Sequence, residues 1–195
     1  MLGLPYESST AALVFGVMLA SAALTELWIR IHTRGGTGAR HDRGSRIVIS
    51  LAIGAGVLGA VESSSRWHGG TLPWPWLWFT AGVGLTASGL VLRVAAVIAL
   101  GRWFTTVVRV AADQIVVTDG PYRWIRHPSY SGLLLELAGI GLMLTDWLSL
   151  LSAVLVPLPA FLWRIQVEER ALSVGLGLAY DDYATTRKRL APGVW

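Results

Sequence analysis

The feature that most constrains this chain is a set of long apolar runs separated by short polar segments. Residues 11–29 form the first run, and residues 74–100 form another whose only charged residue is Arg93. At 1.5 Å per residue, each is long enough to cross a hydrocarbon core about 30 Å thick. Hydrophobic residues make up 53% of the chain and charged residues only 14%, which argues against a soluble globular enzyme. The sequence therefore predicts a protein embedded in the membrane.

Three shorter runs complete the pattern. Residues 47–61 are rich in glycine and alanine, which allows neighbouring helices to approach closely. Residues 133–145 and 147–163 meet at Asp146 and predict a tight helical hairpin, with Pro157 and Pro159 kinking its return arm. We expect an all-α fold, a polytopic membrane helical bundle of about five transmembrane helices. Its 195 residues predict one membrane-embedded domain, with helices one to three in residues 1–100 and the hairpin and polar segments in residues 101–195.

The distribution of arginine predicts how the bundle lies in the membrane. Five arginines lie between the first two runs, at positions 30, 34, 40, 43 and 46. Basic loops favour the cytoplasm, and the segments 101–130 and 164–195 are basic as well. We therefore expect an external N-terminus and a cytoplasmic C-terminus, with both polar segments on the cytoplasmic face. The net charge of +4 then reflects membrane orientation, and we expect no nucleic-acid partner.

Several kinds of site are excluded by composition or spacing. The chain has no cysteine, which rules out disulfides, thiolate zinc sites and a cysteine nucleophile. His32, His41, His68 and His127 show no metal-ligand spacing, so we expect no metal site. No phosphate-binding P-loop, dinucleotide glycine fingerprint or serine nucleophile elbow occurs.

The densest group of polar residues lies in residues 117–132. Asp119-Gly-Pro predicts a turn, and Ser129 is a candidate N-cap for the helix that follows. A helix N-terminus in such a loop can bind a carboxylate or phosphate, and four side chains around it can donate hydrogen bonds. These are Tyr122, Arg126, His127 and Tyr130. An equally weighted alternative is a juxtamembrane loop whose arginines meet lipid headgroups and whose tyrosines lie in the interfacial belt.

Other charged residues lie at or inside the membrane boundary. Arg164 and Glu168 are four residues apart and share one helix face. A surface ion pair of this kind contributes only about 0.3–0.5 kcal/mol, but charges close to hydrocarbon are costly and commonly functional. Arg93 and Glu136 fall inside apolar runs, and two interpretations stay open: each reaches the cytoplasmic end separately, or the two contact each other. Residues 180–192 predict an amphipathic tail at the interface.

Taken in order, these residues resemble a known family. Gly-Pro-Tyr-Arg-Trp-Ile-Arg-His-Pro-Ser-Tyr-Ser-Gly (residues 120–132) resembles the signature of the isoprenylcysteine carboxyl methyltransferase family. Glu-Glu at 168–169, Gly-Leu-Ala-Tyr-Asp-Asp-Tyr at 177–183 and Arg-Leu-Ala-Pro at 189–192 are similar to its C-terminal pattern. The Arg-His-Pro-x-Tyr core also resembles phospholipid methyltransferases and sterol reductases, whereas the full order of motifs is more specific. The resemblance spans residues 101–192.

The resemblance implies an integral membrane methyltransferase with a cytoplasmic pocket for S-adenosylmethionine and a lipid-like or isoprenoid substrate that enters from the bilayer. It implies that Arg164 faces the substrate carboxylate and that Arg164 and Glu168 are the catalytic residues. One departure is Gln114, which stands where the family often has histidine, although glutamine can also donate and accept hydrogen bonds. The implied cofactor-binding residues are Gln114, Ile115, Val116, Val117, Tyr122, Arg126, His127, Pro128, Ser129, Tyr130, Glu168 and Glu169.

The chemistry of methyl transfer fits these residue types. A carboxylate is already ionised, so the reaction needs in-line positioning and exclusion of water more than acid–base catalysis. An arginine can hold a carboxylate, and aromatic faces favour a sulfonium cation. The resemblance and these residue types together predict an S-adenosylmethionine-dependent carboxyl O-methyltransferase for an isoprenoid or other lipidic substrate, and we expect a monomer. The alternatives are a phospholipid or amine methyltransferase, an NADPH-dependent membrane reductase and a non-catalytic membrane scaffold.

Overall fold

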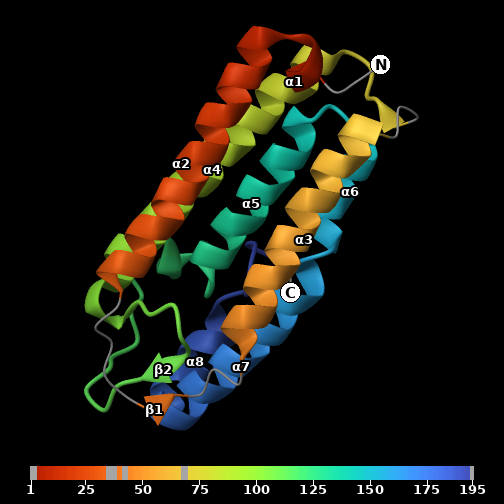
Figure 1. Cartoon of the computed structure of the whole chain (residues 1–195). Coiled ribbons are helices and arrows are strands. Elements are labelled where there is room, and N and C mark those ends of the chain that lie inside the picture. The colour runs from red at the N-terminus through yellow and green to blue at the C-terminus, as the bar shows by residue number, and fades with distance from the viewer. Residues whose placement is uncertain (1–3, 34–38, 41–43, 67–69, 194–195) are drawn as a thin grey trace.

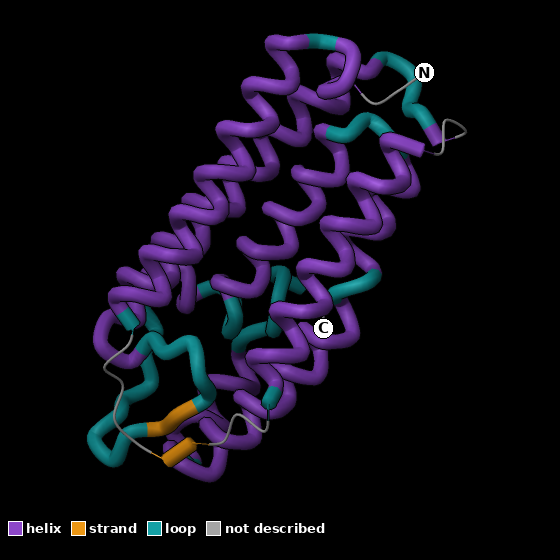
Figure 2. Tube along the Cα trace, in the orientation of Figure 1, coloured by secondary structure: helices purple, strands orange, loops and turns teal. Residues whose placement is uncertain are grey.

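The computed structural model describes residues 4–33, 39–40, 44–66 and 70–193, which form an elongated helical bundle (Figures 1 and 2). Its long segments run alternately in opposite directions along the bundle, and α6 and α7 together make the last pass. The predicted all-α bundle is confirmed. The helices are α1 (Leu4–Glu7), α2 (Ser9–His32), α3 (Ser45–Arg66), α4 (Pro75–Leu100), α5 (Pro128–Met143), α6 (Trp147–Leu155), α7 (Leu158–Leu176) and α8 (Leu178–Thr186).

Four of these passes are long and apolar enough to cross a membrane, which makes the chain an integral multi-pass membrane protein. They are Ser9–His32, Ser45–Arg66, Pro75–Trp103 and Trp147–Leu176. The fifth predicted span is α5, which has only 16 residues and rises about 24 Å. It lies between the longer helices, against α4 and α6.

Glycines determine how closely α4 and α5 pack. A Cβ atom added at Gly82 would lie 2.6 Å from the Gly139 carbonyl oxygen, and one added at Gly89 would lie 2.5 Å from the Gly132 carbonyl oxygen. Neither distance is compatible with a side chain, so the two backbones are in direct contact. This gives α4 and α5 the short separation that brings their polar side chains together.

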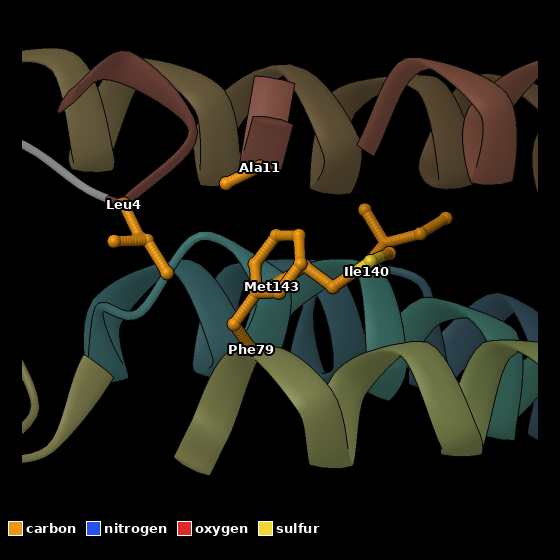
Figure 3. Packing of buried hydrophobic residues seen from close by; sticks show 5 residues of the cluster. All are labelled: Leu4, Ala11, Phe79, Ile140 and Met143. Carbon is orange, nitrogen blue, oxygen red and sulfur yellow. The ribbon is translucent and has the colours of Figure 1, made fainter. Parts of the chain in front are cut away.

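The apolar core joins the N-terminal helices to this pair. Figure 3 shows Leu4 and Ala11 on one side and Phe79, Ile140 and Met143 on the other, all buried in one cluster. The glycine-rich helix α3 packs instead on α6, where the Ser152 hydroxyl donates a 3.1 Å hydrogen bond to the Gly56 carbonyl. The close approach that residues 47–61 predict is therefore made within the bundle.

The predicted hairpin is confirmed at α5 and α6. Asp146 caps α6 by accepting a 2.8 Å hydrogen bond from the Ser149 backbone N–H, and it accepts a 3.0 Å bond from the Ser63 hydroxyl. The return arm is interrupted between α6 and α7 at Pro157, as predicted, because proline lacks the N–H that would continue the helix.

The short elements gather at the end of the bundle away from α1 (Figure 1). They comprise two 3-10 turns, η2 (Gly101–Trp103) and η3 (Gly120–Arg123), and two strands, β1 (Ala39–Arg40) and β2 (Arg109–Val110), which pair antiparallel. Helices α7 and α8 reach the same end. The prediction that the polar segments 101–130 and 164–195 share one face is therefore confirmed.

Candidate active site

The start of α5 places the densest polar motif. The turn predicted at Asp119 is present, and η3 follows it directly. The prediction that Ser129 caps the helix is wrong, because α5 already begins at Pro128 and His127 is the N-cap residue. Proline is favoured in the first helical position, where its fixed φ suits the helix and its missing N–H costs nothing. Ser129 therefore lies inside the first turn.

Tyr130 lies at the centre of the site. Its hydroxyl accepts a 2.8 Å hydrogen bond from Arg164 Nε and donates a 2.7 Å hydrogen bond to Glu168 Oε2. Arg164 and Glu168 share a face of α7, as their spacing predicts, but the phenol of a different helix lies between them. The arrangement is thus not that of an exposed surface ion pair.

Arg164 is buried and ties four segments of the chain together. Besides its bond to Tyr130, it donates to the Ser45 hydroxyl at 2.8 Å and to the Thr106 carbonyl at 2.7 Å. Because α3, α5 and the segment before β2 each contribute a partner to this residue of α7, the guanidinium orientation is set by the tertiary fold. The sequence contains no spacing that would have connected Ser45 or Thr106 with this site.

Glu169 forms a second cluster beside the first. Its carboxylate lies 2.9 Å from Arg126 Nη1, 3.2 Å from His127 Nε2 and 2.8 Å from Arg189 Nη2. The hydrogen bonds from Arg189 to Glu169 raise the pKa of that guanidinium. Glu169 therefore holds Arg126 and His127 in place from α7. Arg189, which the resemblance did not include among the site residues, joins the tail to them.

The C-terminal tail is bound to the motif loop. Its backbone carbonyls at Lys188 and Arg189 accept hydrogen bonds from the N–H groups of Arg126 (2.8 Å) and His127 (3.0 Å). The Tyr183 hydroxyl of α8 donates to the Tyr122 carbonyl at 2.7 Å. The predicted amphipathic tail thus folds back over the site instead of only lying at the interface.

Two tyrosines of this region are buried enough to stay protonated. Burial raises the pKa of Tyr183 to about 12. Burial, and secondarily the nearby Glu168 carboxylate, raises the pKa of Tyr122 further. Both phenols are therefore neutral hydrogen-bond donors at physiological pH.

A continuous cavity of about 470 Å³ connects the site to the membrane part of the bundle. At the site end it is lined by ten of the predicted cofactor-binding residues, whereas Pro128 and Glu169 do not line it. Arg164 and the α8 tyrosines line the same end, and apolar residues of α2, α3 and α5 line the membrane arm. The ten are Gln114, Ile115, Val116, Val117, Tyr122, Arg126, His127, Ser129, Tyr130 and Glu168.

Gln114 also closes a turn at the cavity wall. Its side-chain oxygen accepts a 3.2 Å hydrogen bond from the Ala111 backbone N–H. The backbone N–H of Gln114 donates a 3.1 Å hydrogen bond to the Ala111 carbonyl. The residue that departs from the family pattern thus has a local structural role at the position where the resemblance expects a cofactor contact.

The charged residues inside the bundle contact one another. Arg93 is buried and donates to Glu26 Oε2 at 2.6 Å, and its Nη1 lies 3.4 Å from Glu136 Oε2. The interpretation in which Arg93 and Glu136 reach the cytoplasmic end separately is therefore wrong. Sequence reasoning missed Glu26, although an acidic residue inside the first apolar run was a signal that could have identified it.

Within the described ranges, no group of three or more histidine, aspartate or glutamate side chains could hold a metal ion. His41 and His68 lie outside those ranges.

Comparison with known proteins adds independent findings. Residues 82–174 match the model of the isoprenylcysteine carboxyl methyltransferase (ICMT) family. A probable protein-S-isoprenylcysteine O-methyltransferase of Oryza sativa subsp. indica is 40% identical over 111 residues, which cover 55% of this chain and 58% of that protein. The protein-S-isoprenylcysteine O-methyltransferase of Schizosaccharomyces pombe is 33% identical over 117 residues, which cover 59% and 48% respectively. The chain thus spans about half the length of these curated relatives.

A solved structure shares the fold. The eukaryotic intramembrane Ras methyltransferase ICMT aligns with a TM-score of 0.60 and 26% identity, over 74% of this chain and 52% of that one. The family match runs from residue 82, in the N-terminal half of α4, to residue 174, in the last turn of α7, and includes Tyr130, Arg164 and Glu168. Over this segment, which is just under half of its length, the chain is similar to the isoprenylcysteine carboxyl methyltransferase family.

Proposed function

We propose that this chain is an S-adenosylmethionine-dependent membrane methyltransferase that methylates a carboxylate of an isoprenoid or other lipidic substrate. The observation that carries the proposal is the meeting of Arg164, Tyr130 and Glu168 in one cavity that continues between membrane helices. The names of its relatives support the same reaction class.

The residues of the cavity suit the proposed cofactor. Arg126 lines it, and its Nε is buried without a hydrogen-bond partner among the described residues, which suits the cofactor's carboxylate. Glu168 suits the cofactor's positive charge, and the rings of Tyr122 and Tyr183 line the same end. We assign cofactor binding to the predicted residues that line the cavity. When bound, S-adenosylmethionine would supply a methyl group on a sulfonium sulfur, which keeps the bonding electrons when a carboxylate oxygen takes the methyl.

The side chains of the site have separable roles in this proposal. Arg164 attracts the substrate carboxylate and orients it, because its guanidinium is buried and held in position by Tyr130, Ser45 and Thr106. Tyr130 couples that orientation to Glu168 on the cofactor side. Glu169 does not touch the cofactor and acts by positioning Arg126 and His127. Arg164 and His127 are buried and the other side chains are partly buried, which limits the access of water to the reacting atoms.

The same proposal covers the membrane setting. The site end of the bundle faces the cytoplasm and the N-terminus faces outside, as the arginine distribution favours. The whole chain acts as one domain and as a monomer, without nucleic acid. The lipid chain of the substrate enters from the bilayer and occupies the apolar membrane arm, while its carboxylate reaches Arg164.

The test is calorimetric titration of lipid-reconstituted protein with S-adenosylhomocysteine, with NADPH titrated in parallel. We expect saturable binding of S-adenosylhomocysteine that His127→Ala weakens, and no binding of NADPH. Methyl transfer from S-adenosylmethionine to an S-farnesylcysteine with a free carboxylate is then measured. Folded protein that binds neither ligand contradicts the proposal in favour of a scaffold, and saturable NADPH binding contradicts it in favour of a reductase.

A further inference from the structure

The membrane arm of the cavity contains a charged cluster that methyl transfer does not use. Glu26 of α2, Arg93 of α4 and Glu136 of α5, which we call the membrane triad, line the same cavity as Tyr130. Arg93 and Glu136 are only 6% and 2% exposed. Charged groups this deep in a membrane bundle are costly and call for a specific explanation.

The ion pair between Arg93 and Glu26, at 2.6 Å, would suffice to link α2 with α4. It does not explain two atoms that remain. Glu136 Oε1 and Arg93 Nε are both buried and lack a hydrogen-bond partner within the described part of the chain. A buried polar atom left unpaired costs about 1–3 kcal/mol, and more when the group is charged. Two such atoms on neighbouring side chains of one cavity wall point to a ligand group that binds both.

The chemistry of the two atoms restricts that group. Glu136 Oε1 accepts a hydrogen bond and Arg93 Nε donates one. A hydroxyl both donates and accepts, whereas an ammonium only donates and a carboxylate only accepts. A third charge would also carry a large desolvation cost in the hydrocarbon region. A neutral group that both donates and accepts, such as the hydroxyl of a lipid, therefore satisfies both atoms.

We propose that the membrane triad is a hydroxyl-binding subsite, and that the lipid acceptor of this chain carries a hydroxyl on its hydrocarbon part. Glu136 follows Tyr130 by six residues in α5, so the subsite lies about 9 Å along the helix from the site. This inference rests on the proposed function, because it assigns the carboxylate of the same lipid to Arg164.

The test measures binding and not turnover. The probes are palmitic acid and its monohydroxy isomers, which differ only in the position of the hydroxyl along the chain. Each competes with radiolabelled palmitic acid for the full-length protein in lipid nanodiscs, without cofactor. We expect one hydroxyl position, or two adjacent ones, to bind about tenfold more tightly than palmitic acid, as a newly satisfied buried hydrogen bond would give.

Two variants assign the preference to the triad. Glu136→Leu removes the unpartnered acceptor and is expected to bind all isomers alike. The control is Glu62→Gln, which removes an exposed carboxylate near the end of α3 that lies away from the site. This variant is expected to keep the wild-type preference. If Glu136→Leu does not fold, the wild-type positional scan decides alone.

A flat positional scan overturns the subsite, as does a preference that survives Glu136→Leu or a failure of every isomer to bind. Because no cofactor is present, the scan is independent of methyl transfer. A peaked scan in a protein without methyltransferase activity leaves the subsite standing and contradicts the proposed function. Methylation of a lipid carboxylate together with a flat scan supports the proposed function and contradicts the subsite.

Discussion

The Tyr130 hydroxyl donates a 2.7 Å hydrogen bond to Glu168 while it accepts one from Arg164, so one phenol links the two charged residues of α7. Tyr130 comes from α5, and the helices reach each other only through the packing of the bundle. This relationship makes the predicted roles of the three residues separable by experiment.

Removing the phenolic oxygen should uncouple Arg164 from Glu168. Tyr130→Phe leaves the buried Arg164 guanidinium and the partly buried Glu168 carboxylate each short of one hydrogen bond, and each such loss costs about 1–3 kcal/mol. We expect kcat/KM for methyl transfer to fall by about 10–100-fold, measured by steady-state kinetics with radiolabelled methyl donor. Tyr6→Phe is the matched control, because Tyr6 lies on α1 at the far end of the bundle. Unchanged kinetics in folded Tyr130→Phe would contradict the linking role.

The two charged residues should affect different ligands. Arg164→Ala is expected to raise KM for the lipid carboxylate by about 100-fold, because a charge-assisted hydrogen bond to the substrate is lost, with little change in S-adenosylhomocysteine affinity. Glu168→Ala should weaken S-adenosylhomocysteine binding, with little change in the KM for the lipid carboxylate. Calorimetry gives the cofactor affinity, and kinetics give the KM. Equal losses of both constants in both variants would contradict the division of roles.

Neutralising Glu169 should release both the motif loop and the tail. In Glu169→Gln, Arg126, His127 and Arg189 lose their shared anionic partner. We expect faster hydrogen exchange at the amides of residues 126 and 127, and cofactor affinity about tenfold lower because its donors are no longer held. Glu7→Gln, at the other end of the bundle, is the control. Weaker cofactor binding without faster exchange would indicate direct contact of Glu169 with the cofactor, against the positioning role.

The contact between α4 and α5 should not tolerate a single added methyl group. Gly89→Ala places a Cβ atom 2.5 Å from the Gly132 carbonyl oxygen and is expected to destabilise the protein by about 1–3 kcal/mol. Gly84 lies in the same helix, but no atom is within 4 Å of its added Cβ, so Gly84→Ala should be neutral or stabilising. Thermal unfolding in detergent compares the two. Equal melting temperatures would contradict the close packing.

Much of the architecture was readable from the sequence because the membrane imposes strong rules on it. The runs at 11–29 and 74–100 mark α2 and α4 to within three residues at each end, since a helix in lipid must be apolar over its whole length. The break at Pro157 and the hairpin at Asp146 follow from local chemistry. The cap predicted at Ser129 was misplaced by two positions, because proline takes the first helical position and His127 becomes the N-cap residue.

The sequence by itself determined the apolar spans, the turn signals and the set of residues able to bind a carboxylate or a sulfonium. Only the tertiary structure decided which of them meet. Arg164 reaches Ser45 across 119 positions and Thr106 across 58, and Glu26 joins Arg93 across 67. Periodicity and capping act over a few residues, whereas these contacts depend on how whole helices pack. Their partners are therefore set by the packing of α7 against α3 and against the segment before β2, and of α2 against α4.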